Sequence, residues 1–467
     1  MKYNPVPRPD RTVIVKNNGY QYVYLTQCVK YSPRLKRSVP SRVSIGKLDE
    51  NGMLIPNKKY FELFPDSNGL DELGDRADFI SIGPHLVVDK ISNQLSLYSL
   101  LETVFHDKAD KILDIATYMI MSENNVMQYF DDYGYGHSLF NKANFTDSTI
   151  GKLLGSLTVC QMDLFIRSWV TMQNKDGIYV SYDSSNMNTV AGSLTLAEYG
   201  HAKDNPDLPQ VNLSIGYNQT DEVPMFYEIY PGSIIDNTEC QKMVERAKSY
   251  GCKDVGFILD RGYFSIENIK YFEKHDYDYI LMTKGNAAFI TKSIEESVAL
   301  LKEGYQYYME DYELYGKTIE KELFHTGKKQ YIHIYYDGIA AEREKIIINQ
   351  RFHKLDQQLE EKKNQIIKRQ EDVAGYKKYY RLKFDENGYF QSYKRKDKEI
   401  KELINRAGFF AIITSRKMSA SQALEIYRDR DAIEKVFRME KTYLGNDVFR
   451  VHLDEHLESK VFISFIA

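Results

Sequence analysis

Two aspartates each follow a short, apolar run of residues that is typical of a β-strand. Asp183 ends the run GIYVSYD, and Asp260 ends the run VGFILD. Side chains at the carboxyl ends of strands in an α/β sheet emerge into the crevice where such sheets bind ligands. If the two strands are neighbours, the two carboxylates lie about 5 Å apart and repel each other unless a cation lies between them. Hard oxygen ligands favour Mg²⁺ or Mn²⁺, although a strand-end aspartate can also be a simple turn former or helix cap.

A third acid lies on a helix that the sequence predicts in its last fifty residues. Ser419 opens a capping box and Gly445 is a suitable terminator, so one helix is expected from about residue 420 to 444. One strip of this helix, about 60° wide at about 100° per residue, carries four polar residues, which are Tyr427, Arg430, Glu434 and Lys441. An adjacent stripe that can anchor the helix on a sheet is apolar and contains Ile426, Ile433 and Phe437. A carboxylate on the polar strip can reach a metal ion, and its arginine, lysine and tyrosine donors can reach phosphate oxygens. For Arg430 and Glu434 alone, the alternative is a surface ion pair at i,i+4 spacing.

These residues together resemble the DDE insertion-sequence transposases that carry the Y-R-E-K signature, within the RNase H-like or retroviral integrase superfamily. The resemblance rests on Asp183-Ser184-Ser185, on Leu259-Asp260-Arg261-Gly262-Tyr263 and on the spacing Y-(2)-R-(3)-E-(6)-K, which is met at every position. It covers about residues 176–445. It implies that Asp183, Asp260 and Glu434 are the catalytic, metal-binding acids, and that Tyr427, Arg430 and Lys441 contact DNA at the transposon end.

The function that the resemblance implies is cut-and-paste DNA transposition. Such a protein binds terminal inverted repeats and performs strand cleavage and strand transfer that depend on a divalent metal, with two Mg²⁺ ions (or Mn²⁺) as cofactors. Its partners would be double-stranded DNA, at the transposon ends and at the target, and a second copy of the chain in a homodimeric synaptic complex. Three carboxylates and two divalent ions leave the site slightly positive, which suits a scissile phosphate.

The elements that must position these residues predict a mixed α/β fold. We expect an RNase H-like mixed sheet, interrupted by an insertion domain and preceded by a β-hairpin-rich and then helical N-terminal DNA-binding region. Turn signals at residues 17–19 and 49–52 predict two hairpins. The predicted domains are a β-rich DNA-binding region (1–86), a helical region (87–175), the first half of the catalytic domain (176–290), an insertion of strands and a charged helix (291–405), and a second half with the Glu-bearing helix (406–467).

Two segments of the chain are basic, although the whole chain has a formal charge of −4. Residues 1–47 contain ten Lys/Arg and one acid, and residues 351–401 contain fifteen Lys/Arg and nine acids. The formal charges are therefore +9 and +6, which leaves −19 for the rest of the chain. This division favours a polyanion bound by the basic segments and cations bound by the acidic remainder. The alternative is a solvated surface or, for 351–401, a dimerisation arm.

The basic segments receive candidate roles in DNA binding. Residues 1–47 mix Lys/Arg with tyrosines, a combination suited to phosphate contacts and stacking, so we expect them to recognise the terminal inverted repeats. In the second segment, Lys377, Lys378 and Arg381 are candidates for clamping DNA near the cut.

Composition excludes several other classes of protein. With 467 residues, 43% of them hydrophobic and 27% charged, the chain is a folded globular protein rather than a disordered one. No apolar run approaches the roughly 18–20 residues that span a bilayer, and the start MKYNPVPRPD lacks the apolar stretch of a secretory signal. The four cysteines form no CxxC pair and fit a reducing compartment. We therefore expect no membrane association and a bacterial cytoplasmic location, on the nucleoid when DNA is bound.

Three competing functions remain at this point. One is a transposase-derived DNA-binding protein that lacks activity, because family members usually continue well past the Y-R-E-K helix and this chain ends at Ala467. Another is an RNase H-like nuclease that cleaves without strand transfer. The third is a zinc protease, because His452-Leu453-Asp454-Glu455-His456 fits the H-x-x-E-H pattern. An exposed helix face is the favoured explanation of that match, since the third zinc ligand should lie downstream, where only eleven residues remain.

Neutralising the basic clamp should change the salt dependence of DNA binding. Replacing Lys377, Lys378 and Arg381 with glutamine removes up to three phosphate contacts, each of which contributes about 0.9 to the slope of log affinity against log salt. We expect weaker binding and a slope flatter by about 2–3. Fluorescence anisotropy of labelled duplex DNA at several salt concentrations measures both quantities, with circular dichroism as the control for folding. A slope equal to that of the wild type would favour the solvated-surface or dimerisation reading.

Overall fold

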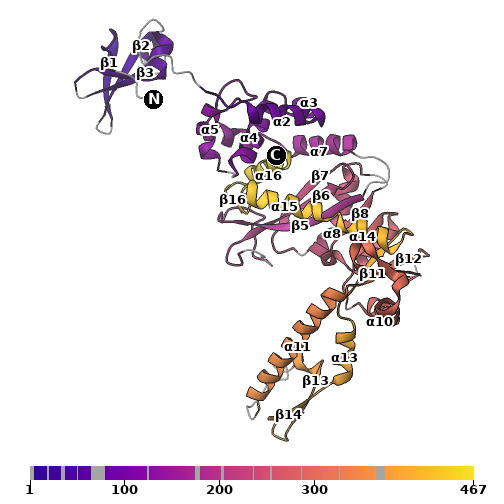
Figure 1. The fold of residues 1–467 in the computed structure, drawn as a ribbon. Coiled ribbons are helices and arrows are strands. Elements are labelled where there is room, and N and C mark those ends of the chain that lie inside the picture. Colours follow the sequence, from indigo (N-terminus) through magenta and orange to yellow (C-terminus); the bar gives the residue numbers. More distant parts are fainter. Residues whose placement is uncertain are drawn as a thin grey trace. The chain divides into compact units, whose positions relative to one another are not determined.

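The computed structural model describes residues 5–17, 20–32, 37–49, 51–64, 79–123, 126–173, 179–200, 205–234, 236–252, 255–285, 287–324, 327–363 and 374–467. The chain divides into two compact units, Met1–Phe79 and Ile80–Ala467, and each is described by itself. Figure 1 shows the antiparallel sheet of the first unit, and the helices, the large sheet and the segment 338–405 of the second.

The first unit is an antiparallel four-stranded sheet with one short helix. Its elements in order are β1 (Thr12–Asn17), β2 (Tyr20–Ser32), β3 (Arg37–Leu48), β4 (Leu54–Pro56) and α1 (Lys58–Leu63). Asn17 pairs with Tyr20 and Leu48 pairs with Leu54, so both predicted hairpins are confirmed, although residues 18, 19 and 50 lie outside the described ones. A small core closes the sheet against the helix and contains Val23, Ile45, Leu54 and Tyr60.

Helices make up the first part of the second unit. They are α2 (Gly83–Gln94), α3 (Leu97–Phe105), α4 (Ala109–Ser122), α5 (Phe130–Gly136), α6 (Asp147–Leu154) and α7 (Val159–Gln173). The indole Nε1 of Trp169 on α7 donates to the carbonyl of Pro224 at 2.8 Å and fastens this helical layer to the sheet. No single described helix is long and apolar enough to cross a membrane; α6 and α7 reach that length and composition only as a pair bent by 79°.

A ten-stranded mixed sheet forms the centre of the second unit. The strand order is β10-β11-β12-β15-β9-β8-β5-β6-β7, and β16 pairs with β5. The strands β5, β8 and β9 are parallel neighbours, whereas the other pairs along this order are antiparallel. Their bounds are β5 (Tyr179–Thr189), β6 (Gln210–Asn218), β7 (Val223–Pro231), β8 (Gly256–Leu259), β9 (Asp278–Met282), β10 (Tyr308–Met309), β11 (Leu314–Lys321), β12 (Gln330–Tyr336), β15 (Phe409–Thr414) and β16 (Val448–Phe449). The predicted RNase H-like mixed sheet, with its hairpin-rich and then helical N-terminal part, is confirmed.

Alternation along the strands divides the core between two faces of the sheet. Val180, Tyr182, Phe257 and Leu259 pack in one cluster with α7, α8 (Asp236–Ser249) and α9 (Ile266–Lys274). On the other face, Ile258 packs with α14 (Ala420–Arg428), and Met187 packs with α15 (Asp431–Arg438) and α16 (Asp454–Ile466). Since side chains alternate with period two, the odd-numbered side chains of β5 and the even-numbered ones of β8 face α14 and α15.

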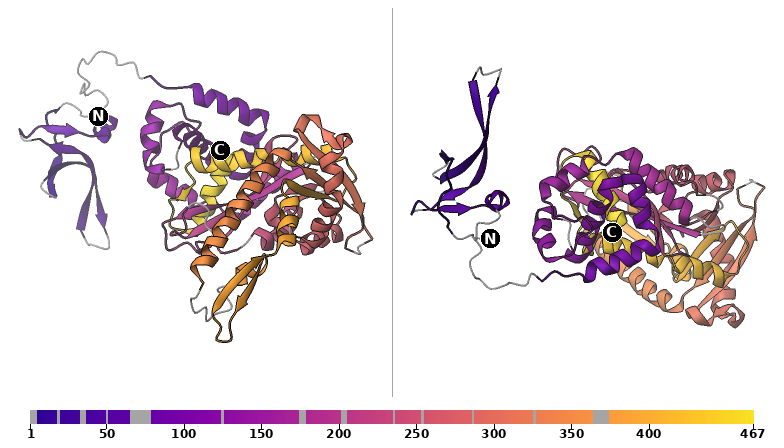
Figure 2. Two further views of the ribbon diagram at one scale, coloured as in Figure 1. Left: turned by 60° about the horizontal axis from the view of Figure 1, so that its bottom comes forward. Right: turned by 90° about the horizontal axis from the view of Figure 1, so that it is seen from above.

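The predicted insertion over 291–405 requires a correction, because part of it belongs to the main sheet. The helix α10 (Ala288–Glu303) packs on β11 and β12, and β12 hydrogen-bonds to β15 over six residue pairs. The segment that leaves the sheet is the shorter stretch 338–405, which we call the arm. Its elements are α11 (Gly338–Glu361), α12 (Ala374–Lys377), β13 (Tyr380–Phe384), β14 (Phe390–Arg395) and α13 (Asp397–Asn405). Figures 1 and 2 show the arm projecting from one end of the sheet.

The arm has a small core of its own and a basic surface. Its core contains Ile348, Phe352, Leu359, Tyr379, Tyr380 and Phe390, together with Ala407 just after the arm. Lys377, Lys378 and Arg381 are exposed, as a DNA contact requires. Tyr379 and Tyr380 are buried, so these two tyrosines stabilise the arm rather than stack on bases. At the base of the arm, the amide of Asp337 donates to the carbonyl of Gly408 at 2.9 Å, and φ of Gly408 is +78°, a conformation that favours glycine.

The single helix predicted over 420–444 is wrong in one respect, because it is broken once and ends in a π-helical turn. The capping box of Ser419 and Gln422 is present as predicted, but α14 ends at Arg428 and α15 begins at Asp431. Between them the amide of Arg430 bonds the carbonyl of Tyr427, and the amide of Ile433 bonds the carbonyl of Arg430. These i→i+3 bonds tighten the chain. After α15 a π-helical turn covers Met439–Tyr443.

A buried histidine gives the main sheet a pH-dependent stability. Nε2 of His333 lies 3.0 Å from Oγ1 of Thr414, and Nδ1 lies 2.9 Å from Oγ1 of Thr318. The Thr414 hydroxyl donates to the carbonyl of Arg416, so Nε2 is the ring donor and Nδ1 accepts from Thr318. Burial lowers the pKa of His333 to about 4 from 6.5, because a protonated ring would lose its acceptor and its hydration.

The free energy of unfolding should therefore fall as the pH falls from about 6.5 to about 4. The unfolded chain binds the proton below about pH 6.5 and the folded chain only near the lowered pKa of about 4. The contribution of His333, at most about 3 kcal/mol, is present above the upper value and lost between the two. Urea unfolding monitored by fluorescence of the single tryptophan, Trp169, measures it. His333→Gln should flatten the curve between these pH values; a variant curve parallel to that of the wild type would contradict the assignment.

Candidate active site

The strands that carry the two aspartates are neighbours, so the condition for a close pair of carboxylates is met. The strands β5 and β8 are parallel, and Tyr182 pairs with Leu259, so Asp183 and Asp260 occupy the next positions of the two strands. Both side chains belong to the face of the sheet that α14 and α15 cover. One detail of the prediction is wrong: β5 does not end at Asp183 but continues to Thr189, because its pairing with β6 extends to Asn188.

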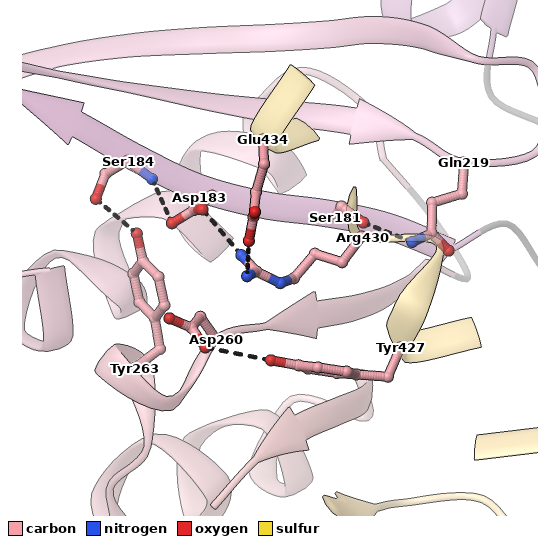
Figure 3. Close-up of polar contacts among 9 residues, drawn as sticks. All are labelled: Ser181, Asp183, Ser184, Gln219, Asp260, Tyr263, Tyr427, Arg430 and Glu434. Atoms are coloured by element: carbon pink, nitrogen blue, oxygen red, sulfur yellow. Dashed lines mark hydrogen bonds and ion pairs between the residues drawn. The ribbon is translucent and has the colours of Figure 1, made fainter. Parts of the chain in front are cut away.

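The helices α14 and α15 bring three more side chains to these aspartates. Tyr427 lies in the last turn of α14, Arg430 lies in the break, and Glu434 lies in the first turn of α15. Ile433 and Phe437 are buried in the cluster that also contains the β6 residues of this face, so the predicted apolar stripe anchors α15. Figure 3 shows the three side chains directed toward the two strand acids.

Arg430 connects two of the predicted catalytic acids. Its Nη1 lies 2.9 Å from Oδ2 of Asp183, and its Nη2 lies 2.5 Å from Oε1 of Glu434. Arg430 is 8% exposed. Burial alone would lower the pKa of Arg430, but the carboxylate of Asp183 and the other acidic groups around it raise that pKa. The guanidinium is therefore a permanent cation between the two carboxylates.

Asp260 has a different partner, the phenol of Tyr427. The hydroxyl donates to Oδ1 of Asp260 at 3.2 Å. Burial, together with the neighbouring Asp260 carboxylate, raises the pKa of Tyr427, so the phenol is a neutral donor. The guanidinium carbon of Arg430 lies 5.8 Å from the centroid of the Tyr427 ring, so arginine and tyrosine form one continuous donor surface across the acids.

A contact that the sequence did not reveal fixes β5 to the turn after β8. The amide of Ser184 donates to Oδ1 of Asp183 at 2.9 Å, and the hydroxyl of Tyr263 donates to Oγ of Ser184 at 3.0 Å. Tyr263 is fully buried, and its carbonyl accepts from Nδ2 of Asn268 at 2.9 Å. The tyrosine of the Asp-Arg-Gly-Tyr motif therefore ties the turn that follows Asp260 to β5. The only sequence signal was a tyrosine among buried residues, whose hydroxyl needs a partner.

The oxygen donors fit a hard divalent cation only in part. Among the residues that the structure describes, no group of three or more His, Cys, Asp or Glu side chains is placed to hold a metal ion. Asp183 and Asp260 offer carboxylates from neighbouring strands, which is the donor type that Mg²⁺ prefers. The Arg430 guanidinium lies between Asp183 and Glu434. The donor types therefore suit such an ion, but the described side chains are not placed to hold one in this arrangement.

The remaining predicted DNA contacts lie apart from this cluster. An open depression beside the acids is lined by Tyr427, Arg428, Arg430, Asp431 and Glu434. Lys441 instead lines a depression with Asn188 and Arg450, beside the far end of β5. The prediction that all four residues lie on one continuous strip is therefore wrong. The break and the π-helical turn rotate later side chains away from the direction that a regular helix would give them. Lys377, Lys378 and Arg381 belong to the arm.

The Tyr263–Ser184 contact should contribute measurable coupling. We expect Tyr263→Phe and Ser184→Ala each to lower the free energy of unfolding, and the double variant to lower it by less than the sum. The coupling energy should be about 0.5–1.5 kcal/mol, the usual value of one buried hydrogen bond. Urea unfolding of the four proteins measures it. Strict additivity would show that the hydroxyl does not link the two strands.

Comparisons with known proteins identify a family. A family model described as a transposase DDE domain matches residues 179–467. No curated protein matches the chain. Of the solved structures, a cryo-EM piggyBac transposase synaptic complex with hairpin DNA is similar with a TM-score of 0.35 and 9% identity, over 68% of this chain and 53% of that one. A Mos1 transposase paired-end complex with the left transposon end gives 0.17 and 11%, over 52% and 72%. The chain thus spans about half the length of the piggyBac chain it matches. Because the matched domain covers more than half of its residues, the chain belongs to the DDE transposase family.

Proposed function

We propose that this transposase carries out cut-and-paste DNA transposition, with Asp183, Asp260 and Glu434 as its catalytic acids. The observation that carries the proposal is the meeting of these side chains on one face of the sheet. Arg430 contacts Asp183 across 247 positions of sequence and also contacts Glu434. Tyr427, which belongs to the same motif, contacts Asp260. A surface ion pair at i,i+4 spacing would not include residues from two separate strands.

The chemistry assigns a role to each side chain. The three carboxylates would hold two Mg²⁺ ions, or Mn²⁺, which when bound activate an attacking water or 3′-hydroxyl and stabilise the leaving oxygen. Tyr427 is a neutral donor and Arg430 a permanent cation, so both suit the non-bridging oxygens of a phosphate. The Tyr263–Ser184 contact ties β5 to the turn that follows Asp260. Cleavage would free a 3′-hydroxyl that is used again in strand transfer.

DNA binding would extend over both basic segments. The side chains of Arg37, Arg42 and Lys47 are exposed along β3, and Tyr20 and Tyr31 are 56% and 65% exposed on β2. Cations beside exposed aromatic rings suit phosphate contacts and stacking. We propose that this sheet recognises terminal inverted repeats, that Lys441 and the arm residues Lys377, Lys378 and Arg381 contact DNA, and that a homodimer forms the synaptic complex. We also propose that the protein acts in the bacterial cytoplasm, since its four cysteines are free thiols.

One observation favours a second candidate function, a DNA-binding protein without activity. The Arg430 guanidinium holds Asp183 and Glu434, and a permanent occupant would prevent metal binding. Cleavage of transposon-end DNA in Mg²⁺ distinguishes the two functions, and joining of the cleaved 3′ end to a target distinguishes a transposase from a simple nuclease.

Removing either acid should abolish cleavage while DNA binding persists. We expect Asp183→Asn and Glu434→Gln each to lower the rate of Mg²⁺-dependent cleavage by about 10³-fold or more, because each removes a charged metal ligand. Binding of the same duplex should change by less than about threefold, which is under 1 kcal/mol. Gel assays on duplexes from the DNA that flanks the gene measure both. Asp431→Asn, which neutralises an exposed acid in the same depression, is the matched control. Cleavage that survived either acid substitution would refute the assignment.

A further inference from the structure

The guanidinium of Arg430 occupies the position between two carboxylates where a cation is needed. It bonds Oδ2 of Asp183 at 2.9 Å and Oε1 of Glu434 at 2.5 Å. Asp183 belongs to β5 and Glu434 belongs to α15, so the guanidinium joins acids from two different elements. The side chain of Arg430 is 10% exposed and that of Asp183 is 21% exposed, whereas that of Glu434 is 54% exposed. The ion pair is therefore closed on the sheet side and open to solvent on the helix side.

A guanidinium and a divalent ion compete for these two carboxylates. Arg430 bonds one oxygen of each acid, and a divalent ion bound to the same carboxylates would lie within a few ångströms of this fixed positive charge. Bonds between a guanidinium and a carboxylate are charge-assisted and about twice as strong as neutral ones. The repulsion and the loss of these bonds both oppose metal binding at Asp183 and Glu434 while Arg430 stays in place.

The surroundings of Arg430 offer a place for the released side chain. Arg430 and Glu434 line the open depression together with Tyr427, Arg428 and Asp431. A phosphate that enters this depression offers two acceptor oxygens in the geometry that a guanidinium prefers. The negative charge of the phosphate would also replace the two carboxylates as the partner of the Arg430 guanidinium.

We propose that Arg430 is an exchangeable internal counter-ion, which closes the metal site in the DNA-free protein and leaves it when a DNA phosphate binds. This inference rests on the proposed function and adds a regulation to it. Because a coupling between two binding sites is reciprocal, DNA strengthens metal binding and metal strengthens DNA binding. The acids are thus kept from holding ions, and from cleaving at random, until a DNA backbone is present.

The test measures Mn²⁺ binding to the full chain without DNA, by the electron paramagnetic resonance signal of the free ion. Arg430→Gln should bind Mn²⁺ about tenfold more tightly than the wild type, which corresponds to about 1.4 kcal/mol. Arg428→Gln is the matched control, because Arg428 lines the same depression but lies over the ring of Tyr312, at 4.9 Å. It should change the affinity by less than about twofold, since it removes only a more distant charge. In the double variant Asp183→Asn with Arg430→Gln, the gain should disappear.

Two further measurements keep the inference falsifiable if Arg430→Gln folds poorly. Arg430→Lys keeps the charge but cannot bridge two carboxylates in the same geometry, so its Mn²⁺ affinity should lie between those of the wild type and Arg430→Gln. Adding a short blunt duplex should raise the Mn²⁺ affinity of the wild type more than that of Arg430→Gln, after subtraction of the signal with Asp183→Asn. Equal affinities for Arg430→Gln and Arg428→Gln, or a lower affinity for Arg430→Gln, would overturn the exchange.

The outcomes separate this inference from the proposed function. If the wild type cleaves end DNA in Mg²⁺ but Arg430→Gln leaves Mn²⁺ affinity unchanged, the exchange is wrong and the function stands. If Arg430→Gln binds Mn²⁺ more tightly in a way that depends on Asp183, but neither the wild type nor any variant cleaves end DNA, the exchange stands and the function is wrong.

Discussion

Carboxylates on neighbouring strands repel each other, and this repulsion is the constraint that shapes the site. The parallel pairing of β5 and β8 places Asp183 and Asp260 side by side on one face of the sheet. Folding brings Glu434 toward the same face from a distant part of the chain. Three acids in a partly buried place are stable only if cations or donors compensate them. Arg430 and Tyr427 supply this compensation, so the signature residues neutralise the site as well as suiting a phosphate.

The fold meets this constraint with a rigid support behind each acid. The strand acids lie on central strands whose opposite face is packed against α7, α8 and α9. Glu434 is held by the burial of Ile433 and Phe437 one residue before it and three residues after it. The hydroxyl of Tyr263 links β5 to the turn after β8. Burial of polar partners is costly unless they are hydrogen-bonded, which explains why donors and acceptors around the acids are so closely paired.

The sequence predicted what depends on local pattern and missed what depends on distant partners. Both hairpins and the helical region follow from turn residues and helical spacing, and short apolar runs identify the strands that carry Asp183 and Asp260. The strands β11 and β12 look like part of an insertion in the sequence, because nothing local reveals that β12 pairs with β15. The strip from Tyr427 to Lys441 assumed one regular helix, whereas the break at Arg430 and the π-helical turn alter its phase. The bridge from Arg430 to Asp183 spans 247 positions, and no spacing rule identifies such a pair.

The arm leaves and re-enters the sheet at a single point. Tyr336 and Phe409 are paired at the ends of β12 and β15, and the amide of Asp337 bonds the carbonyl of Gly408 just outside them. In topological terms the arm replaces the turn of an antiparallel hairpin. With a hydrophobic core of its own, it adds length at a place where the strand register is already fixed. Evolution could therefore lengthen, shorten or exchange this module among related proteins without disturbing Asp183, Asp260 and Glu434, since insertions between two paired strands alter only the loop that joins them.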